Sequence, residues 1–161
     1  MHTYTARRNF GDRHINTAIQ IIASKFHIQS EKISIADDAI DKTQATDLIL
    51  PYGRRAAFRC RSHNIYKTHK DEITIRMTAP YGLSEYSKFQ KGMVDIFIYG
   101  FDVDDCFSHW FIISIPDLLS EIKRNPKEIK HVYPPDGNHF IEIKIKQIPT
   151  SIIFQESINL Q

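Results

Sequence analysis

Two short segments of the chain carry side chains that could bind a metal ion or a phosphate group. The first holds four aspartates, and the second, which follows closely, holds four arginines within eight positions. They are Asp37, Asp38, Asp41 and Asp47, and Arg54, Arg55, Arg59 and Arg61. Carboxylates are the hard oxygen ligands that Mg²⁺ prefers, and guanidinium groups bind phosphate oxygens. The pattern therefore indicates either a solvated surface of ion pairs or a metal site beside a phosphate track.

The segments around these residues predict an alternation of helices and strands. Apolar residues at helical spacing predict a helix over residues 12–26, with Asp12 as its N-cap, and further helices near 84–91 and 117–124. Apolar and alternating runs predict strands over residues 32–36, 46–50, 55–62, 72–77, 94–100, 110–115 and 140–148. The last strand alternates isoleucine with charged residues, which is typical of a half-solvated strand at a sheet edge. We expect one α/β domain over residues 1–161.

The composition excludes several classes of protein. With 42% hydrophobic and 25% charged residues, long disordered segments are not expected. Neither an apolar leader nor eighteen consecutive apolar residues occur, which predicts a cytoplasmic protein without a membrane partner. Cys60 and Cys106 lie in separate apolar runs and are expected to be reduced core residues. A Gly-rich phosphate loop, a GxSxG elbow and an HExxH motif are missing, and the eight scattered histidines argue against a structural zinc site.

The hairpin that contains these charged residues resembles the active-site hairpin of the PD-(D/E)XK nuclease superfamily, to which type II restriction enzymes and Holliday-junction resolvases belong. The resemblance rests on Thr46-Asp47-Leu48-Ile49-Leu50, a turn, and Ala57-Phe58-Arg59-Cys60-Arg61. Three later segments are similar to small, uncharacterised, phage-associated branches of that superfamily. They are Ile73-Thr74-Ile75-Arg76, Glu85-Tyr86-Ser87-Lys88 and Asp95-Ile96-Phe97-Ile98-Tyr99-Gly100. This resemblance implies a restriction endonuclease-like fold, with a central mixed β-sheet flanked by helices.

The resemblance also implies a chemistry, namely phosphodiester hydrolysis that depends on Mg²⁺ or Mn²⁺. In the family, an aspartate and a second acid bind the metal, and a lysine two residues later supplies a cation for the attacking water. Asp47 matches the first acid. Arg59 and Arg61 stand where the second acid and the lysine would be, and arginine can neither bind Mg²⁺ nor act as a base.

Glu85 and Lys88 could take over the two missing roles from the following helix. Residues three apart on a helix share a face, so both side chains could reach the site of Asp47. Asp12, Asp41 or Asp95 would then complete the metal ligands. The other reading of Glu85 and Lys88 is an ordinary surface ion pair.

A later segment matches the letters of the family motif more literally. Pro135-Asp136 is followed, after five residues, by Glu142-Ile143-Lys144. The chain is too short after Lys144 for the helix and strand that the family places there. Alternating glutamate and lysine are also common on a solvated strand face. We therefore prefer the hairpin of Asp47 as the site.

The arginines are the candidate nucleic-acid-binding residues. This set consists of Arg54, Arg55, Arg59, Arg61 and Arg76. Alternate members of a strand would face one groove and hold phosphates without reading the sequence, and Tyr52 and Tyr66 could stack on unpaired bases. A solvated strand face with the aromatic rings in the core is the other reading.

Three functions remain open on this basis. The first is a metal-dependent nuclease that uses Asp47, Glu85 and Lys88. The second is a catalytically inactive relative that binds nucleic acid or a protein partner, for instance a phage-encoded factor that acts on host defence. A structural role is the third, and it is favoured if the arginines pair with Asp37, Asp38 and Asp41. A homodimer would agree with the family resemblance.

Overall fold

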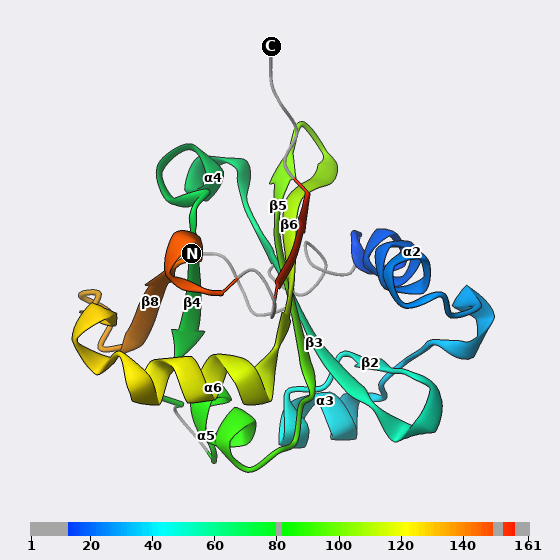
Figure 1. Ribbon diagram of the computed structural model, residues 1–161, viewed down its shortest axis with the longest axis horizontal. Coiled ribbons are helices and arrows are strands. Elements are labelled where there is room, and N and C mark those ends of the chain that lie inside the picture. Colours follow the sequence, from blue (N-terminus) through cyan, green and yellow to red (C-terminus); the bar gives the residue numbers. More distant parts are fainter. Residues whose placement is uncertain (1–12, 80–81, 150–152, 157–161) are drawn as a thin grey trace.

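The computed structural model describes residues 13–79, 82–149 and 153–156, which form two β-sheets and the helices around them (Figure 1). The larger sheet has the strand order β1-β2-β3-β5-β6-β9. Its strands are Ser34–Ile35 (β1), Leu48–Ile49 (β2), Arg55–Arg61 (β3), Ile96–Val103 (β5), Cys106–Ser114 (β6) and Ile153–Glu156 (β9). The pair β3 and β5 is parallel and the other pairs are antiparallel. The predicted α/β class with a mixed sheet flanked by helices is thus confirmed.

A smaller antiparallel sheet has the order β4-β8-β7. Its strands are Glu72–Arg76 (β4), Lys130–Val132 (β7) and Phe140–Lys144 (β8). The prediction that the last strand lies at a sheet edge was wrong, because β7 and β4 pair with both sides of β8. This strand also ends early, and Ile145–Gln147 forms a 3-10 turn instead. In the small sheet, β4 is therefore an edge strand.

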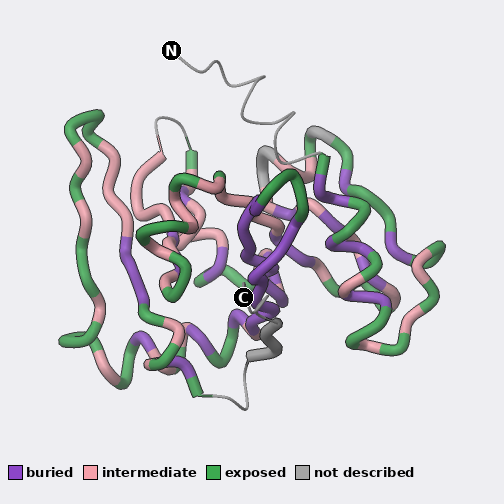
Figure 2. The backbone as a smooth tube through the Cα atoms, turned by 90° about the horizontal axis from the view of Figure 1, so that it is seen from above, coloured by how far each residue is buried: buried purple, intermediate pink, exposed green. Residues whose placement is uncertain are grey.

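Helices and the small sheet cover the two faces of the large sheet. The helices are Ile15–Phe26 (α2), Asp38–Gln44 (α3), His63–His69 (α4), Glu85–Gln90 (α5) and Ile115–Arg124 (α6). α2 packs on one face, and the small sheet with α5 and α6 lies on the other (Figure 1). Side chains of β5 alternate accordingly: Ile96 and Ile98 face α2, whereas Phe97, Tyr99 and Phe101 face the small sheet. The buried residues concentrate around this central strand (Figure 2).

The β5–β6 hairpin requires special backbone conformations. Asp104 and Asp105 form its tight turn with φ of 53° and 61°. A register shift occurs between Tyr99 and Phe101. A Cβ atom on the intervening Gly100 would lie 2.5 Å from Cζ of Phe107, so the close approach of this ring requires glycine.

Several local predictions differ from the structure. The first helix begins at Ile15, after His14, and the predicted cap Asp12 lies outside the described residues. The helix α4 occupies the stretch between the predicted strands 55–62 and 72–77, where no helix was predicted. Cys60 is half-buried and free, as expected, but Cys106 is exposed, because it begins β6 next to the hairpin turn. None of the described helices is both long enough and apolar enough to cross a membrane.

Candidate functional site

Asp47 is held at the start of the β2–β3 hairpin by main-chain and side-chain hydrogen bonds. Its N–H donates to the carbonyl of Ala56 over 2.9 Å, and its carbonyl accepts from the N–H of Ala36 over 2.9 Å. The carboxylate oxygen Oδ2 accepts from the N–H of Phe58 over 2.6 Å. The carboxylate thus continues the hydrogen-bond ladder of β3 beyond the end of β2 and is fixed in place.

The surroundings of Asp47 hold its proton unusually tightly. The pKa of this carboxyl is raised from 3.8 to about 7, mainly by burial and to a smaller extent by the nearby charges of Asp41 and Glu85. The Phe58 N–H and the Arg59 guanidinium oppose this effect. The carboxyl is therefore about half protonated at neutral pH. A strongly shifted carboxyl beside other acidic and basic groups is typical of functional sites.

Glu85 begins α5, and its carboxylate is engaged on both oxygens. The helix is capped by the Ser84 hydroxyl, which accepts from the N–H of Ser87. Oε1 of Glu85 forms an ion pair with the Arg59 guanidinium, and Oε2 accepts from the N–H of Arg76 over 2.8 Å. Both side chains of this ion pair are largely buried, with 13% of Glu85 and 19% of Arg59 exposed.

The edge of β4 explains this arrangement. The N–H of Met77 and the carbonyl of Asp71 form hydrogen bonds toward β8, so the backbone groups of the even-numbered residues between them point away from β8. The carbonyl of Thr74 accepts from the Arg59 guanidinium over 2.9 Å, while the N–H of Arg76 binds Glu85. The ion pair therefore occupies the free edge of β4 and ties it to β3 of the large sheet.

Arg61 lies on the same face of β3 as Arg59 and has a different environment. Its side chain is half-buried and forms neither a hydrogen bond nor an ion pair within the described part of the chain, and its buried Nε atom lacks a hydrogen-bond partner. Burial lowers the pKa of this guanidinium and the Arg59 charge acts in the same direction, whereas Tyr99 and the more distant Glu85 carboxylate partly oppose the shift. A half-buried cation without a counterion is costly, and an incoming anion would relieve that cost.

The other predicted arginines are distributed differently. Arg54 lies over the Phe26 ring of α2, 5.5 Å from its centroid, and is therefore on the other side of the sheet. The Arg55 guanidinium donates to the carbonyl of Gly92 over 2.6 Å and lies 4.0 Å from the Asp95 carboxylate. Arg76 lies over the Phe140 ring. The five arginines thus do not line a common groove.

The predicted metal ligands come together only in part. The structure brings Asp47, Glu85 and the α3 residue Asp41 close enough for their charges to interact. Lys88 lies on α5, one turn after Glu85. However, Glu85 already binds Arg59 and the β4 backbone through both of its oxygens, so these acids do not fit a divalent metal as they stand.

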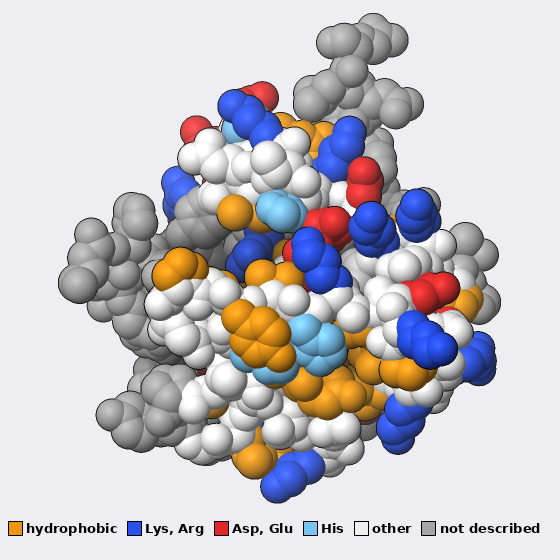
Figure 3. Space-filling model, turned by 90° about the vertical axis from the view of Figure 1, so that its left-hand side faces the viewer, with side chains coloured by type: hydrophobic (Ala, Val, Ile, Leu, Met, Phe, Trp, Pro, Cys, Tyr) orange, Lys and Arg blue, Asp and Glu red, His pale blue; other side chains and the backbone are white. Residues whose placement is uncertain are grey.

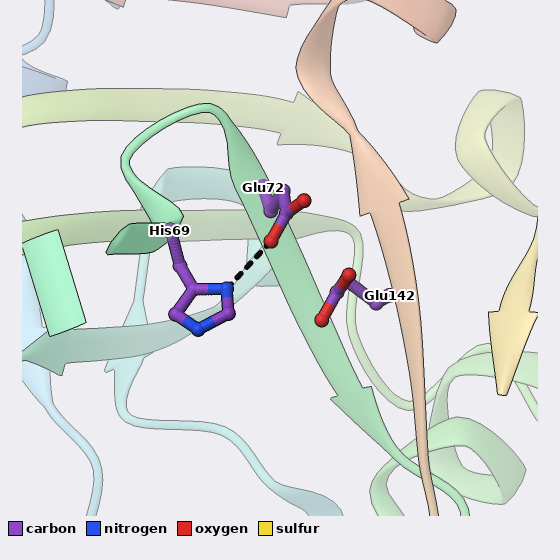
Figure 4. A group of neighbouring side chains, drawn as sticks. All are labelled: His69, Glu72 and Glu142. Carbon is purple, nitrogen blue, oxygen red and sulfur yellow. Dashed lines mark hydrogen bonds and ion pairs between the residues drawn. The ribbon is translucent and has the colours of Figure 1, made fainter. Parts of the chain in front are cut away.

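One group with three convergent metal-ligating atoms exists among the described residues, and the sequence analysis did not assign it. It consists of His69, Glu72 and Glu142 (Figure 4). His69 and Glu72 are three apart, which is a weak signal, and Glu142 belongs to the segment that matches the PD-(D/E)XK motif literally. The convergence of these side chains depends on the pairing of β4 with β8.

The two predicted stacking residues also differ in their environments. Tyr52 is fully exposed, whereas Tyr66 packs edge-on against Phe101 and is not available as a platform. An aromatic stack that was not predicted lies at the end of the small sheet. There the Tyr133 ring, 70% exposed, stacks on His139 with a centroid distance of 4.4 Å.

No model of a known protein family matches this chain, and no curated protein sequence is significantly similar to it. The functional interpretation therefore depends on the geometry described above. The likeness to PD-(D/E)XK nucleases remains a prediction from the sequence.

Proposed function

We propose that this protein is a nuclease-like domain that binds nucleic acid through a backbone phosphate and does not hydrolyse it. The observation that carries the proposal is the half-buried Arg61 side chain, which forms no ion pair or side-chain hydrogen bond with any residue that the structure describes. A phosphate at Arg61 would accept charge-assisted hydrogen bonds from its guanidinium, which forms two parallel hydrogen bonds with phosphate oxygens. Such a contact gives affinity without sequence specificity.

The surroundings of Arg61 suit a polyanion better than a single phosphate ion. The helix α4 begins two residues after Arg61. It carries the exposed Lys67, and the exposed Lys70 follows directly after its last residue. Lys and Arg side chains are scattered over the side of the molecule that bears the small sheet, rather than gathered in one stripe (Figure 3). The exposed ring of Tyr133 stacks on His139 near Met77, at the end of β4 away from α4, and adds a second surface on which an unpaired base of a longer strand could stack. We therefore expect single-stranded nucleic acid to bind better than duplex.

We expect binding without hydrolysis because Glu85 is paired with Arg59 and Asp47 holds its proton, so neither acid is ready to bind a metal ion. Arg59 supplies the positive charge beside Glu85 that a metal would otherwise supply. Asp47 holds its proton up to a pKa of about 7, and a metal ligand must be deprotonated. Metal-dependent hydrolysis is the second candidate, and the closeness of Asp47, Asp41 and Glu85 favours it.

Fluorescence anisotropy with a labelled single-stranded oligonucleotide tests the binding. We expect affinity that falls steeply with salt and that weakens at least about tenfold in Arg61→Gln, because a charge-assisted hydrogen bond is lost. Arg124→Gln is the matched control, since Arg124 is 70% exposed and pairs with Glu121 on α6. Absence of binding at low salt, or equal effects of both substitutions, would refute the proposal.

The same oligonucleotide incubated with Mg²⁺ or Mn²⁺ distinguishes the two candidates. We expect it to remain intact. Metal-dependent cleavage that disappears in Asp47→Asn would establish the nuclease instead.

A further inference from the structure

The side chains of His69, Glu72 and Glu142 converge from three elements on one face of the small sheet. His69 ends α4, Glu72 begins β4, and Glu142 lies in the middle of β8. Glu142 is directly opposite Thr74, so Glu72 is its diagonal neighbour on the same face. The three ligand atoms lie within 4.8 Å of one another, and Nδ1 of His69 is 2.7 Å from Oε2 of Glu72 (Figure 4).

The charge of this group is only partly compensated. Glu142 is 6% exposed and 17% of the Glu72 side chain is exposed, so both carboxylates are largely removed from water. The Lys130 ammonium lies 2.8 Å from Oε1 of Glu142, whereas 64% of the Lys130 side chain is exposed. One ammonium, that of Lys130, opposes the two carboxylates, and His69 adds a positive charge only when its imidazole is protonated. A divalent cation would compensate both carboxylates together.

We infer that His69, Glu72 and Glu142 form a binding site for a divalent first-row transition metal such as Zn²⁺ or Mn²⁺. One imidazole nitrogen with two carboxylates suits these ions, whereas Mg²⁺ and Ca²⁺ prefer oxygen ligands alone. Ligands about 2.0–2.1 Å from a tetrahedral zinc ion are roughly 3.3 Å apart, so small side-chain rotations close the site. The metal would replace the hydrogen bond between His69 and Glu72 and displace Lys130 into solvent.

This site is separate from the proposed phosphate contact and does not depend on it. His69 lies on α4 between Lys67 and Lys70, but none of the three ligands is Asp47 or Arg61, which belong to the large sheet and its β2–β3 hairpin. The Asp47→Asn variant is therefore expected to bind the metal as the wild type does. A loss of nucleic-acid binding and a loss of metal binding are distinguishable in the same set of variants.

Calorimetric titration of the whole chain with ZnCl₂, repeated with MnCl₂, tests the inference. We expect one ion per chain, with affinity reduced at least about tenfold in His69→Asn and in Glu142→Gln. His63→Asn, at the other end of α4, and Glu128→Gln are matched controls that should leave the affinity unchanged. The inference is overturned if the wild type binds neither ion at 100-fold excess over protein, or if the controls weaken binding as much as the ligand variants do.

Lys130→Gln leaves all three ligands in place and should raise the metal affinity, whereas the ligand variants should lower it. Because Lys130 is exposed and competes for Glu142, its removal should tighten metal binding several-fold. Circular dichroism of each variant separates unfolding from loss of the site, and Lys130→Gln still decides the question if the ligand variants do not fold. Unchanged or weaker metal binding in a folded Lys130→Gln protein would contradict the inference.

Discussion

Replacing Asp47 with asparagine should stabilise the protein at alkaline pH. Asparagine has nearly the same shape, and its side-chain oxygen can still accept the hydrogen bond from the N–H of Phe58. The substitution removes only the ability to ionise. A carboxyl whose pKa is raised by folding binds its proton more tightly in the folded protein than in the unfolded chain. Its favourable contribution is complete below the unfolded pKa and is lost as pH rises through the folded pKa.

The size of the effect follows from the two pKa values. The pKa of Asp47 rises from 3.8 to about 7, and each unit corresponds to about 1.4 kcal/mol, so ionisation costs the wild type about 4 kcal/mol above pH 8. Between pH 5 and pH 8, the loss is about 2.5 kcal/mol. Asp47 retains some contact with solvent, which makes these values the upper end of the expected change.

Urea unfolding of the wild type and Asp47→Asn at pH 5, 6, 7 and 8 measures this directly. The difference between the two free energies of unfolding should grow with pH in favour of Asp47→Asn, while contributions from other titrating groups cancel to first order. A difference that stays constant over this range would show that Asp47 has an ordinary pKa in the folded protein. In that case the carboxyl would be ionised at neutral pH and would be able to bind a metal ion.

Two further substitutions test the Arg59–Glu85 ion pair and the close packing of Gly100 against Phe107. Arg59→Gln should lower the free energy of unfolding by about 3 kcal/mol, because Glu85 would remain buried without its cation, and adding Glu85→Gln should recover part of the loss in a double-mutant cycle. Strict additivity of the two substitutions would contradict the ion pair. Gly100→Ala should lower the stability by about 1–3 kcal/mol through the clash with Phe107, and Phe107→Leu in the same chain should relieve it. An unchanged melting temperature in Gly100→Ala would refute the proposed close approach.

Local patterns were sufficient to predict the centre of the fold. The apolar runs of β5 and β6 are buried on both faces, and such runs are recognisable without knowledge of the partner strands. The small sheet had no comparable signal, since Glu72 pairs with Lys144 from a distant part of the chain. Likewise, α4 is polar apart from Ile65 and Tyr66, so its sequence does not differ from that of a loop.

The candidate site was predictable in its residues but not in their pairing. Alternation along β3 placed Arg59 and Arg61 on one face, and the hairpin placed Asp47 beside them. That Arg59 would bind Glu85, rather than the aspartates before the hairpin, depends on the free edge of β4. The position of that edge is a property of the tertiary structure. Neither the isolation of Arg61 nor the convergence of Glu142 with His69 could be read from spacing alone.

The Arg59–Glu85 pair also affects the tendency of this protein to self-associate. An open strand edge is a template on which a second chain can add a strand, which leads to domain swapping or aggregation. On β4, side chains of the same molecule already occupy the carbonyl of Thr74 and the N–H of Arg76. The ion pair thus blocks the backbone groups of β4 to which a strand of a second chain would bind. Chains that lose it would first fail by assembling into oligomers through β4, even where they still fold.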